Sequence, residues 1–124
     1  MAICEKPMSL NFDEAKLAKE YIDKYKVLFF EAIAYRTHPQ TINILNSLKI
    51  LRDTKEEISI NCSFGFNAEI PEDHRLRNLM MGGGAILDVG CYPLSMVKLL
   101  AGQILDKPHA DPESIEVSGE LDTT

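Results

Sequence analysis

Three short stretches of this 124-residue chain hold residue types that could do chemistry. The first is Glu5-Lys6-Pro7, which follows the apolar stub Ala2-Ile3-Cys4 and places an amine at the end of an expected strand. In open α/β sheets, ligands bind beyond the carboxyl ends of the strands, so Lys6 is a candidate for contact with a substrate. Pro7 restricts Lys6 to an extended backbone and so limits the direction of its side chain. A solvated surface lysine is the alternative interpretation.

The second stretch runs from Glu31 to Pro39, directly after an apolar run, and contains Tyr35 and Arg36. Arg36 carries a permanently charged, planar guanidinium group, which suits the binding of phosphate or carboxylate. It also leaves the carboxyl end of an expected strand. The alternative is a linker in which Arg36 makes an ordinary surface ion pair.

The third stretch is Gly82 to Pro93, with three consecutive glycines at its start. Such glycines let the backbone approach a ligand or another backbone closely. Asp88 is an acid in an apolar segment, so it needs a partner, and Tyr92 shares its face if the segment is helical. The glycine spacing differs from that of known phosphate-binding loops. A glycine-rich turn before a core helix is therefore the alternative.

Hydrophobic periodicity indicates the elements that must position these residues. Residues 2–4 and 27–30 read as strands, and a helix over residues 12–25, capped by Asn11, lies between them. An apolar run buried on both faces is typical of a parallel sheet, so this part has the strand–helix–strand pattern of an α/β domain.

The rest of the chain has an α+β pattern. A helix is expected from Pro39 to about Leu51, and the alternation of apolar and polar residues over 58–67 predicts a strand of an antiparallel sheet. A helical segment is expected from Gly82 to Leu100, stopped by Gly102, with a kink or a new helix start at Pro93. Residues 115–121 alternate like another strand.

Composition narrows the functional class. Hydrophobic residues make up 45% and charged residues 26% of the chain, as in soluble globular proteins. The net charge of −6 argues against nucleic acid or an anionic membrane as a partner. No continuous apolar run approaches the roughly 20 residues of a membrane span, and no signal peptide is evident, so a cytoplasmic location is predicted. The three cysteines and three histidines are scattered, so neither a disulfide framework nor a metal site is predicted.

Taken in order, the three stretches resemble one enzyme family. Glu5-Lys6-Pro7, then Glu31-Ala32-x-x-Tyr35-Arg36-x-His38-Pro39, then Gly82-Gly83-Gly84-Ala85-x-Leu87-Asp88-x-Gly90-x-Tyr92 is similar to the glucose–fructose oxidoreductase and inositol dehydrogenase (Gfo/Idh/MocA) family of NAD(P)-dependent oxidoreductases. Tyr92 stands where inositol dehydrogenases carry histidine. The resemblance is therefore strongest to the trans-dihydrodiol, xylose and glucose–fructose enzymes.

The resemblance implies a fold. Residues 1–37 would form the C-terminal end of a Rossmann NAD(P)-binding domain, and residues 38–124 would begin an α+β substrate and oligomerisation domain with a mostly antiparallel sheet. The family's Gly-x-Gly-x-x-Gly fingerprint precedes its Glu-Lys-Pro motif and is not found in this sequence. The chain is thus expected to be an internal fragment, inactive alone, of an enzyme that forms homo-oligomers.

The resemblance also implies a reaction, namely hydride transfer between NADP or NAD, with NADP favoured, and the alcohol carbon of a sugar, cyclic polyol or dihydrodiol. Lys6 would lie beside the reacting oxygen, Tyr92 would be the general acid/base, and Asp88 would accept a hydrogen bond from the substrate or from Lys6. The expected cofactor-binding residues are Glu5, Pro7, Tyr35 and Arg36.

Two other interpretations remain open. The chain could be a non-catalytic remnant, or an interaction module, that lacks cofactor binding. It could also be a small self-contained α+β domain in which the motifs occur by chance. Cofactor binding distinguishes the first of these from a dehydrogenase, because a retained site would raise the melting temperature in the presence of NADPH.

Overall fold

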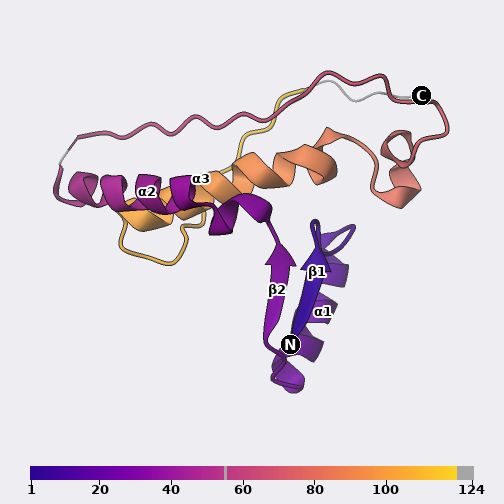
Figure 1. The fold of residues 1–124 in the computed structure, drawn as a ribbon, viewed down its shortest axis with the longest axis horizontal. Helices are drawn as coiled ribbons and strands as arrows, with labels where there is room; N and C mark the ends of the chain where they lie inside the picture. The colour runs from indigo at the N-terminus through magenta and orange to yellow at the C-terminus, as the bar shows by residue number, and fades with distance from the viewer. Residues whose placement is uncertain (55, 120–124) are drawn as a thin grey trace.

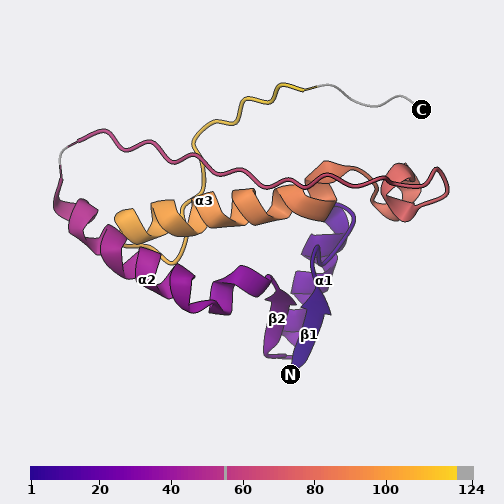
Figure 2. The same cartoon turned by 45° about the horizontal axis from the view of Figure 1, so that its top comes forward.

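The computed structural model describes residues 1–54 and 56–119. The strands and α1 form one arm of the molecule, and α2 and α3 lie side by side in the other (Figures 1 and 2). The arrangement is a small α/β structure with five regular elements: β1 (Ala2–Glu5), α1 (Phe12–Lys24), β2 (Phe29–Ala32), α2 (Pro39–Leu48) and α3 (Cys91–Ile104).

The predicted strand–helix–strand unit is confirmed. β1 and β2 pair in parallel, with Glu5 opposite Ala32 at the carboxyl end of the sheet. β2 begins two residues later than the predicted strand over 27–30, because Val27 still belongs to the turn after α1, where its N–H donates to the carbonyl of Ile22 at 3.0 Å.

The start of α1 follows the predicted capping pattern. The Asn11 side chain accepts a hydrogen bond from the Glu14 N–H at 3.0 Å, and the Glu14 carboxylate accepts one from the Leu10 N–H at 3.1 Å. These two contacts satisfy backbone donors that the first turn of a helix leaves without partners. α1 thereby begins at Phe12, as predicted.

α2 and α3 make the main helix–helix contact. Pro39 occupies the first turn of α2, where its missing N–H costs nothing. α2 ends at Leu48, and a 3₁₀ turn over Lys49–Asp53 continues the predicted helix in a tighter form. Within this turn, Arg52 Nε donates to the carbonyl of Gln103 at 2.9 Å, which ties the turn to the end of α3.

The two strands predicted for the second half of the chain are wrong. Residues 58–67 are extended and run past α3, yet they pair with no other described segment (Figure 1). Residues 115–119 are also extended and pair with none of the residues that the structure describes, and residues 120–121 lie outside the described residues. Alternation specifies an extended backbone with two faces, but a strand also needs a neighbouring backbone to bond with. The predicted antiparallel sheet is therefore not present in the described residues.

The glycine-rich helical segment is confirmed with different internal boundaries. A π-helical turn covers Ile86–Gly90, and α3 then starts at Cys91, two residues before Pro93. The predicted new helix start at Pro93 is wrong, because Gly90 is itself right-handed helical and the π-helical turn continues into α3 without a break; Pro93 lies in the first turn of α3, where proline is well tolerated. Gly102 does not end α3. A Cβ there would lie 2.5 Å from the Cα of His109, so glycine allows the following chain to pack closely against the helix.

The expectation about membrane-length segments needs correction. Among the described residues, the helical stretch Leu79–Ile104 is, at 26 residues, long and apolar enough to cross a membrane by length and composition. Glycines, Asp88 and Lys98 interrupt the apolar run in the sequence, but the folded backbone joins its parts. Core helices of water-soluble proteins meet the same criteria.

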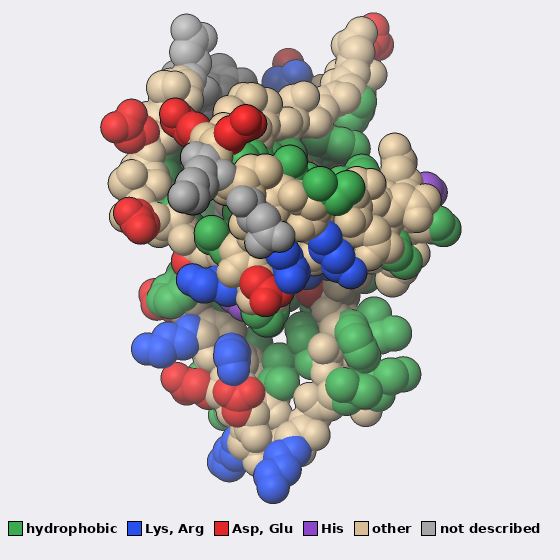
Figure 3. Space-filling model, turned by 90° about the vertical axis from the view of Figure 1, so that its left-hand side faces the viewer, with side chains coloured by type: hydrophobic (Ala, Val, Ile, Leu, Met, Phe, Trp, Pro, Cys, Tyr) green, Lys and Arg blue, Asp and Glu red, His purple; other side chains and the backbone are tan. Residues whose placement is uncertain are grey.

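Apolar side chains in the described residues are at most partly buried. None of them is fully enclosed, and the buried polar residue is Thr41. Figure 3 shows hydrophobic side chains open on the surface beside charged ones. Between α1 and the start of β2, a hollow of about 780 Å³ remains, lined by Phe12, Ile22 and Phe29 among others.

Candidate active site

The parallel sheet brings the first two motifs to one edge. Because β1 and β2 end together, Lys6 and the 3₁₀ turn Ala34–Thr37 leave the sheet at its carboxyl edge. The Glu31 carboxylate accepts a hydrogen bond from the Met8 N–H at 2.9 Å and links the two segments. The structure thus gathers these motifs where α/β folds bind their ligands.

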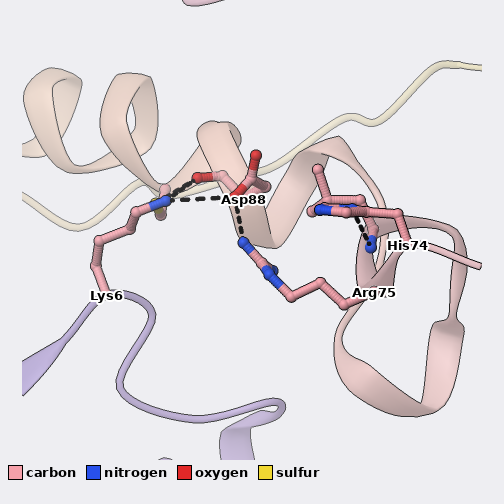
Figure 4. A network of polar contacts seen from close by, with 6 residues as sticks. Lys6, His74, Arg75 and Asp88 are labelled. Atoms are coloured by element: carbon pink, nitrogen blue, oxygen red, sulfur yellow. Dashed lines mark hydrogen bonds and ion pairs between the residues drawn. The ribbon is translucent and has the colours of Figure 1, made fainter. Parts of the chain in front are cut away.

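Lys6 reaches from this edge to the third motif. Its Nζ lies 3.6 Å from Asp88 Oδ1 and also donates a hydrogen bond to the Asp88 backbone carbonyl (Figure 4). The two side chains are only 17% and 15% exposed, so their charges interact with little screening. Asp88 therefore has the partner that an acid in an apolar segment requires.

Tyr92 lies on the other side of Lys6. The Lys6 Nζ is 5.0 Å from the centre of the Tyr92 ring, a cation–π contact. The rings of Phe64 and Tyr35 approach the same ring, with centroid distances of 5.3 Å and 6.3 Å. Among the described residues, the Tyr92 hydroxyl makes no hydrogen bond to Lys6. The structure thus brings Lys6, Asp88 and Tyr92 together around one ammonium group.

The expected cofactor residues lie near this group in different settings. Tyr35 Oη is 2.7 Å from Ser95 Oγ, and Arg36 Nη2 donates to the same oxygen at 2.9 Å, so both contact the first half of α3. Arg36 is exposed and Tyr35 is half-buried. Pro7 is half-buried after a cis peptide bond, and Glu5 is exposed.

Arg75 belongs to the site but was not predicted to. Its Nη2 lies 3.2 Å from Asp88 Oδ1, the oxygen that also faces Lys6 (Figure 4). The sequence places Arg75 in a charged loop, Glu72-Asp73-His74-Arg75, with no periodic pattern to indicate its direction. Only the return of this loop toward Asp88 identifies it.

Gly83 and Gly84 hold the loop that carries Arg75 back toward Asp88. The N–H groups of Gly83 and Gly84 donate to the carbonyls of Asn78 and Leu76 at 2.9 Å and 2.8 Å. A Cβ on Gly83 would lie 2.7 Å from either carbonyl oxygen, so only glycine permits this approach. The triple glycine therefore packs backbone against backbone, which is one of the two uses expected from the sequence.

A cavity of about 250 Å³ adjoins Asp88. Asp88 is the one charged residue among those that line it. The other lining side chains are mostly apolar, including Phe64, Phe66, Ile70, Leu76 and Val89. The site therefore combines an ammonium group, a phenol and a carboxylate beside a small apolar hollow, which suits proton transfer on a small hydroxyl compound.

Comparisons with known proteins show that the sequence is similar to those of redox enzymes. No family model and no solved structure matches the chain. The chain is 32% identical over 124 residues to trans-1,2-dihydrobenzene-1,2-diol dehydrogenase of Xenopus tropicalis. This alignment covers 98% of the chain and 34% of the relative. The chain is 29% identical over 100 residues to D-xylose 1-dehydrogenase (NADP(+)) 2 of Haloferax volcanii, which covers 81% and 30%.

A third relative is D-xylose 1-dehydrogenase (NADP(+)) of Hypocrea jecorina, 29% identical over 102 residues, which cover 77% of this chain and 26% of the relative. The chain spans about a third of the length of these relatives. It is therefore similar in sequence to oxidoreductases that are named as sugar and dihydrodiol dehydrogenases.

Proposed function

We propose that this chain supplies the acid–base residues of a Gfo/Idh/MocA-type dehydrogenase, which oxidises an alcohol carbon of a small sugar, polyol or dihydrodiol. The observation that carries the proposal is the position of the Lys6 ammonium between Asp88 and the face of Tyr92. Two motifs that are distant in the sequence meet there. The similarity to xylose and dihydrodiol dehydrogenases supports the reaction class.

The residues at the sheet edge fit the nicotinamide end of NADP or NAD. Arg36 offers an exposed guanidinium group and Tyr35 a half-buried phenol at the carboxyl edge of the parallel sheet. Glu5 and Pro7 flank Lys6 at the same edge. We propose that these four residues hold the nicotinamide end, and two of the relatives are named for NADP(+).

The proposed reaction separates a hydride from a proton. An oxidised nicotinamide, held by Glu5, Pro7, Tyr35 and Arg36, would supply the acceptor for the hydride of the alcohol carbon. Tyr92 Oη, as the general base, takes the proton of the alcohol hydroxyl, and the Lys6 ammonium stabilises the negative charge that develops on the substrate oxygen. Lys6 and Arg75 both contact Asp88 Oδ1, which leaves Asp88 Oδ2 to accept a hydrogen bond from a second hydroxyl of the substrate.

We further propose that the chain corresponds to an internal segment of such an enzyme. Residues 1–37 would belong to its cofactor-binding domain and residues 38–124 to its substrate domain. The alignment to the Xenopus tropicalis relative supports this assignment, because it takes in 98% of this chain but 34% of that protein.

A hybrid enzyme tests the proposed function. This chain replaces the matching segment of the Xenopus tropicalis dehydrogenase, and oxidation of dihydrodiol and of xylose is followed by NADPH absorbance. We expect a folded hybrid that turns over, and Lys6→Met and Tyr92→Phe variants that lose at least about tenfold in kcat. A folded hybrid whose turnover is absent, or is unaffected by both substitutions, would contradict the proposal.

A non-catalytic interaction module is the second candidate. The exposed aromatic side chains favour it, since Phe30, Phe64 and Phe66 are 51%, 54% and 61% exposed. Exposed apolar patches of this kind can mark contacts with other proteins. Two measurements distinguish the interaction module from the dehydrogenase segment. In sedimentation, a module that uses these side chains would self-associate tightly. In a fluorescence titration, it would not quench the emission of NADPH.

A further inference from the structure

We propose that Arg75 is a positioning residue of this site, which holds the Asp88 carboxylate so that the charge of Lys6 stays available to a substrate oxygen. The inference rests on the proposed function. It names a residue outside the three motifs, and it concerns how the site divides one negative charge between two cations.

The geometry is a carboxylate oxygen shared by two cations. Arg75 Nη2 lies 3.2 Å from Asp88 Oδ1, and Lys6 Nζ lies 3.6 Å from the same atom. The guanidinium is thus the closer of the two groups. Figure 4 shows the two side chains approaching Asp88 from different parts of the chain.

The charges explain what Arg75 contributes. One carboxylate beside one ammonium would neutralise it and draw Lys6 toward Asp88 alone. With Arg75 present, the three groups carry a net charge of +1, so the ammonium also attracts an oxyanion near Tyr92. Since Arg75 is 52% exposed, solvent screens part of its charge, and we expect its effect on stability to be small.

Local structure fixes the direction of Arg75. It begins the 3₁₀ turn Arg75–Arg77, which the His74 side chain caps by accepting a hydrogen bond from the Leu76 N–H at 3.2 Å. Arg77 in the same turn points elsewhere, because its Nε donates to the carbonyl of Ile70 at 3.0 Å. The turn therefore offers a matched control with the same charge and a different contact.

The first experiment measures the reactivity of the Lys6 amine in the complete 124-residue chain. Each lysine is labelled by limiting amounts of an isotope-coded acylating reagent and quantified by mass spectrometry. In Arg75→Gln, Lys6 should label at least about twofold more slowly, because Asp88 then holds its ammonium alone. Arg75→Lys should retain most of the native rate, and Arg77→Gln should leave it unchanged.

Lys19 is the internal reference, since it pairs with Asp23 on α1, away from this site. Equal Lys6 labelling in the native chain and Arg75→Gln, with Lys19 also unchanged, would overturn the inference. The inference is also overturned if Arg77→Gln slows the labelling of Lys6 as much as Arg75→Gln does. Neither outcome depends on dehydrogenase activity, so it is distinguishable from failure of the proposed function.

The second experiment uses the hybrid dehydrogenase. Arg75→Ala should lower kcat by about fivefold or more while the KM for NADP stays within about twofold, because the cation acts on the proton-transfer residues. Millimolar guanidinium ions should restore part of kcat, since the native side chain is reachable from solvent. An unchanged kcat, or a loss that guanidinium does not reverse and that Arg77→Ala reproduces, would contradict the assignment.

Discussion

Lys6 and Tyr92 are far apart in the sequence, yet the Lys6 ammonium lies 5.0 Å from the centre of the Tyr92 ring. The ammonium faces the ring and not the hydroxyl. This leaves the Tyr92 hydroxyl without a hydrogen bond to the ammonium, while the positive charge still favours an oxyanion on a bound substrate nearby. The contact therefore joins the two motifs without blocking the group proposed to move the proton.

The two tyrosines of the site should differ in what their hydroxyls do. Tyr35 Oη is bonded to Ser95 Oγ at 2.7 Å, whereas the Tyr92 hydroxyl makes no hydrogen bond among the described residues. Tyr35→Phe should lower the free energy of unfolding by about 1 kcal/mol, and Tyr92→Phe should change it by less than about half that. Urea unfolding of the chain measures both. A larger loss for Tyr92→Phe would contradict the free hydroxyl on which its proposed role depends.

The Lys6–Asp88 pair should contribute to stability as well as to the site. Its side chains are 17% and 15% exposed, so Lys6→Met and Asp88→Asn should each cost about 1–3 kcal/mol. In a double-mutant cycle the two changes should show a coupling free energy of about 1 kcal/mol, because each removes the same contact. Additive losses would indicate that the pair does not interact in solution.

The α/β half of the chain could be predicted from local rules. Asn11 and Glu14 cap α1 as their spacing indicates, and the two apolar runs form the parallel pair β1 and β2. The cap joins residues that are three or four positions apart, and the strand pair needs only the one helix between its strands. The second half differs, because residues 58–67 are extended as predicted but pair with no strand in the described part of the chain.

The sequence predicts the site residue that follows a strand, because the end of the strand fixes the direction of its side chain. It does not predict the site residue that lies in an irregular loop. Lys6 follows β1 and therefore points from the sheet edge, and it reaches both Asp88 and Tyr92. Arg75 sits in a polar loop whose path depends on backbone contacts made by glycines further along. No periodicity records such contacts, so the sequence offered no reason to place Arg75 beside Asp88.

Gly83 provides a direct test of that loop. A Cβ there would come within 2.7 Å of the carbonyl oxygens of Asn78 and Leu76, which are backbone atoms that cannot move aside easily. Gly83→Ala should therefore destabilise the chain by about 1–3 kcal/mol. In the hybrid enzyme, it should also reduce the recovery of kcat that guanidinium gives to Arg75→Ala. The control is Gly65→Ala, because a Cβ on Gly65 meets nothing within 4 Å. Equal thermal stability of the two variants would contradict this packing.

Asp111 should give the chain a pH-dependent contact at the end of α3. The Lys98 ammonium donates a hydrogen bond to Asp111 Oδ1 at 2.6 Å, and this bond and the Lys98 charge, with a smaller contribution from His109, lower the pKa of Asp111 from its ordinary value of 3.8. A carboxyl whose folded pKa is lowered stabilises the fold above its unfolded pKa. That contribution is lost as the pH falls through the lower, folded value.

Lys98→Met should therefore raise the pKa of Asp111 toward 3.8, as measured by NMR titration of its carboxyl carbon. Because the Asp111 side chain is 73% exposed, about 1 M salt should produce much of the same rise in the native chain. Lys107→Met is the matched control, since it removes a lysine of equal charge that makes no ion pair with Asp111. If Asp111 titrates identically in the native chain and Lys98→Met, the ion pair does not form in solution, and backbone contacts such as the hydrogen bond from the Ala110 N–H to the Lys98 carbonyl at 3.0 Å hold the segment after α3 without it.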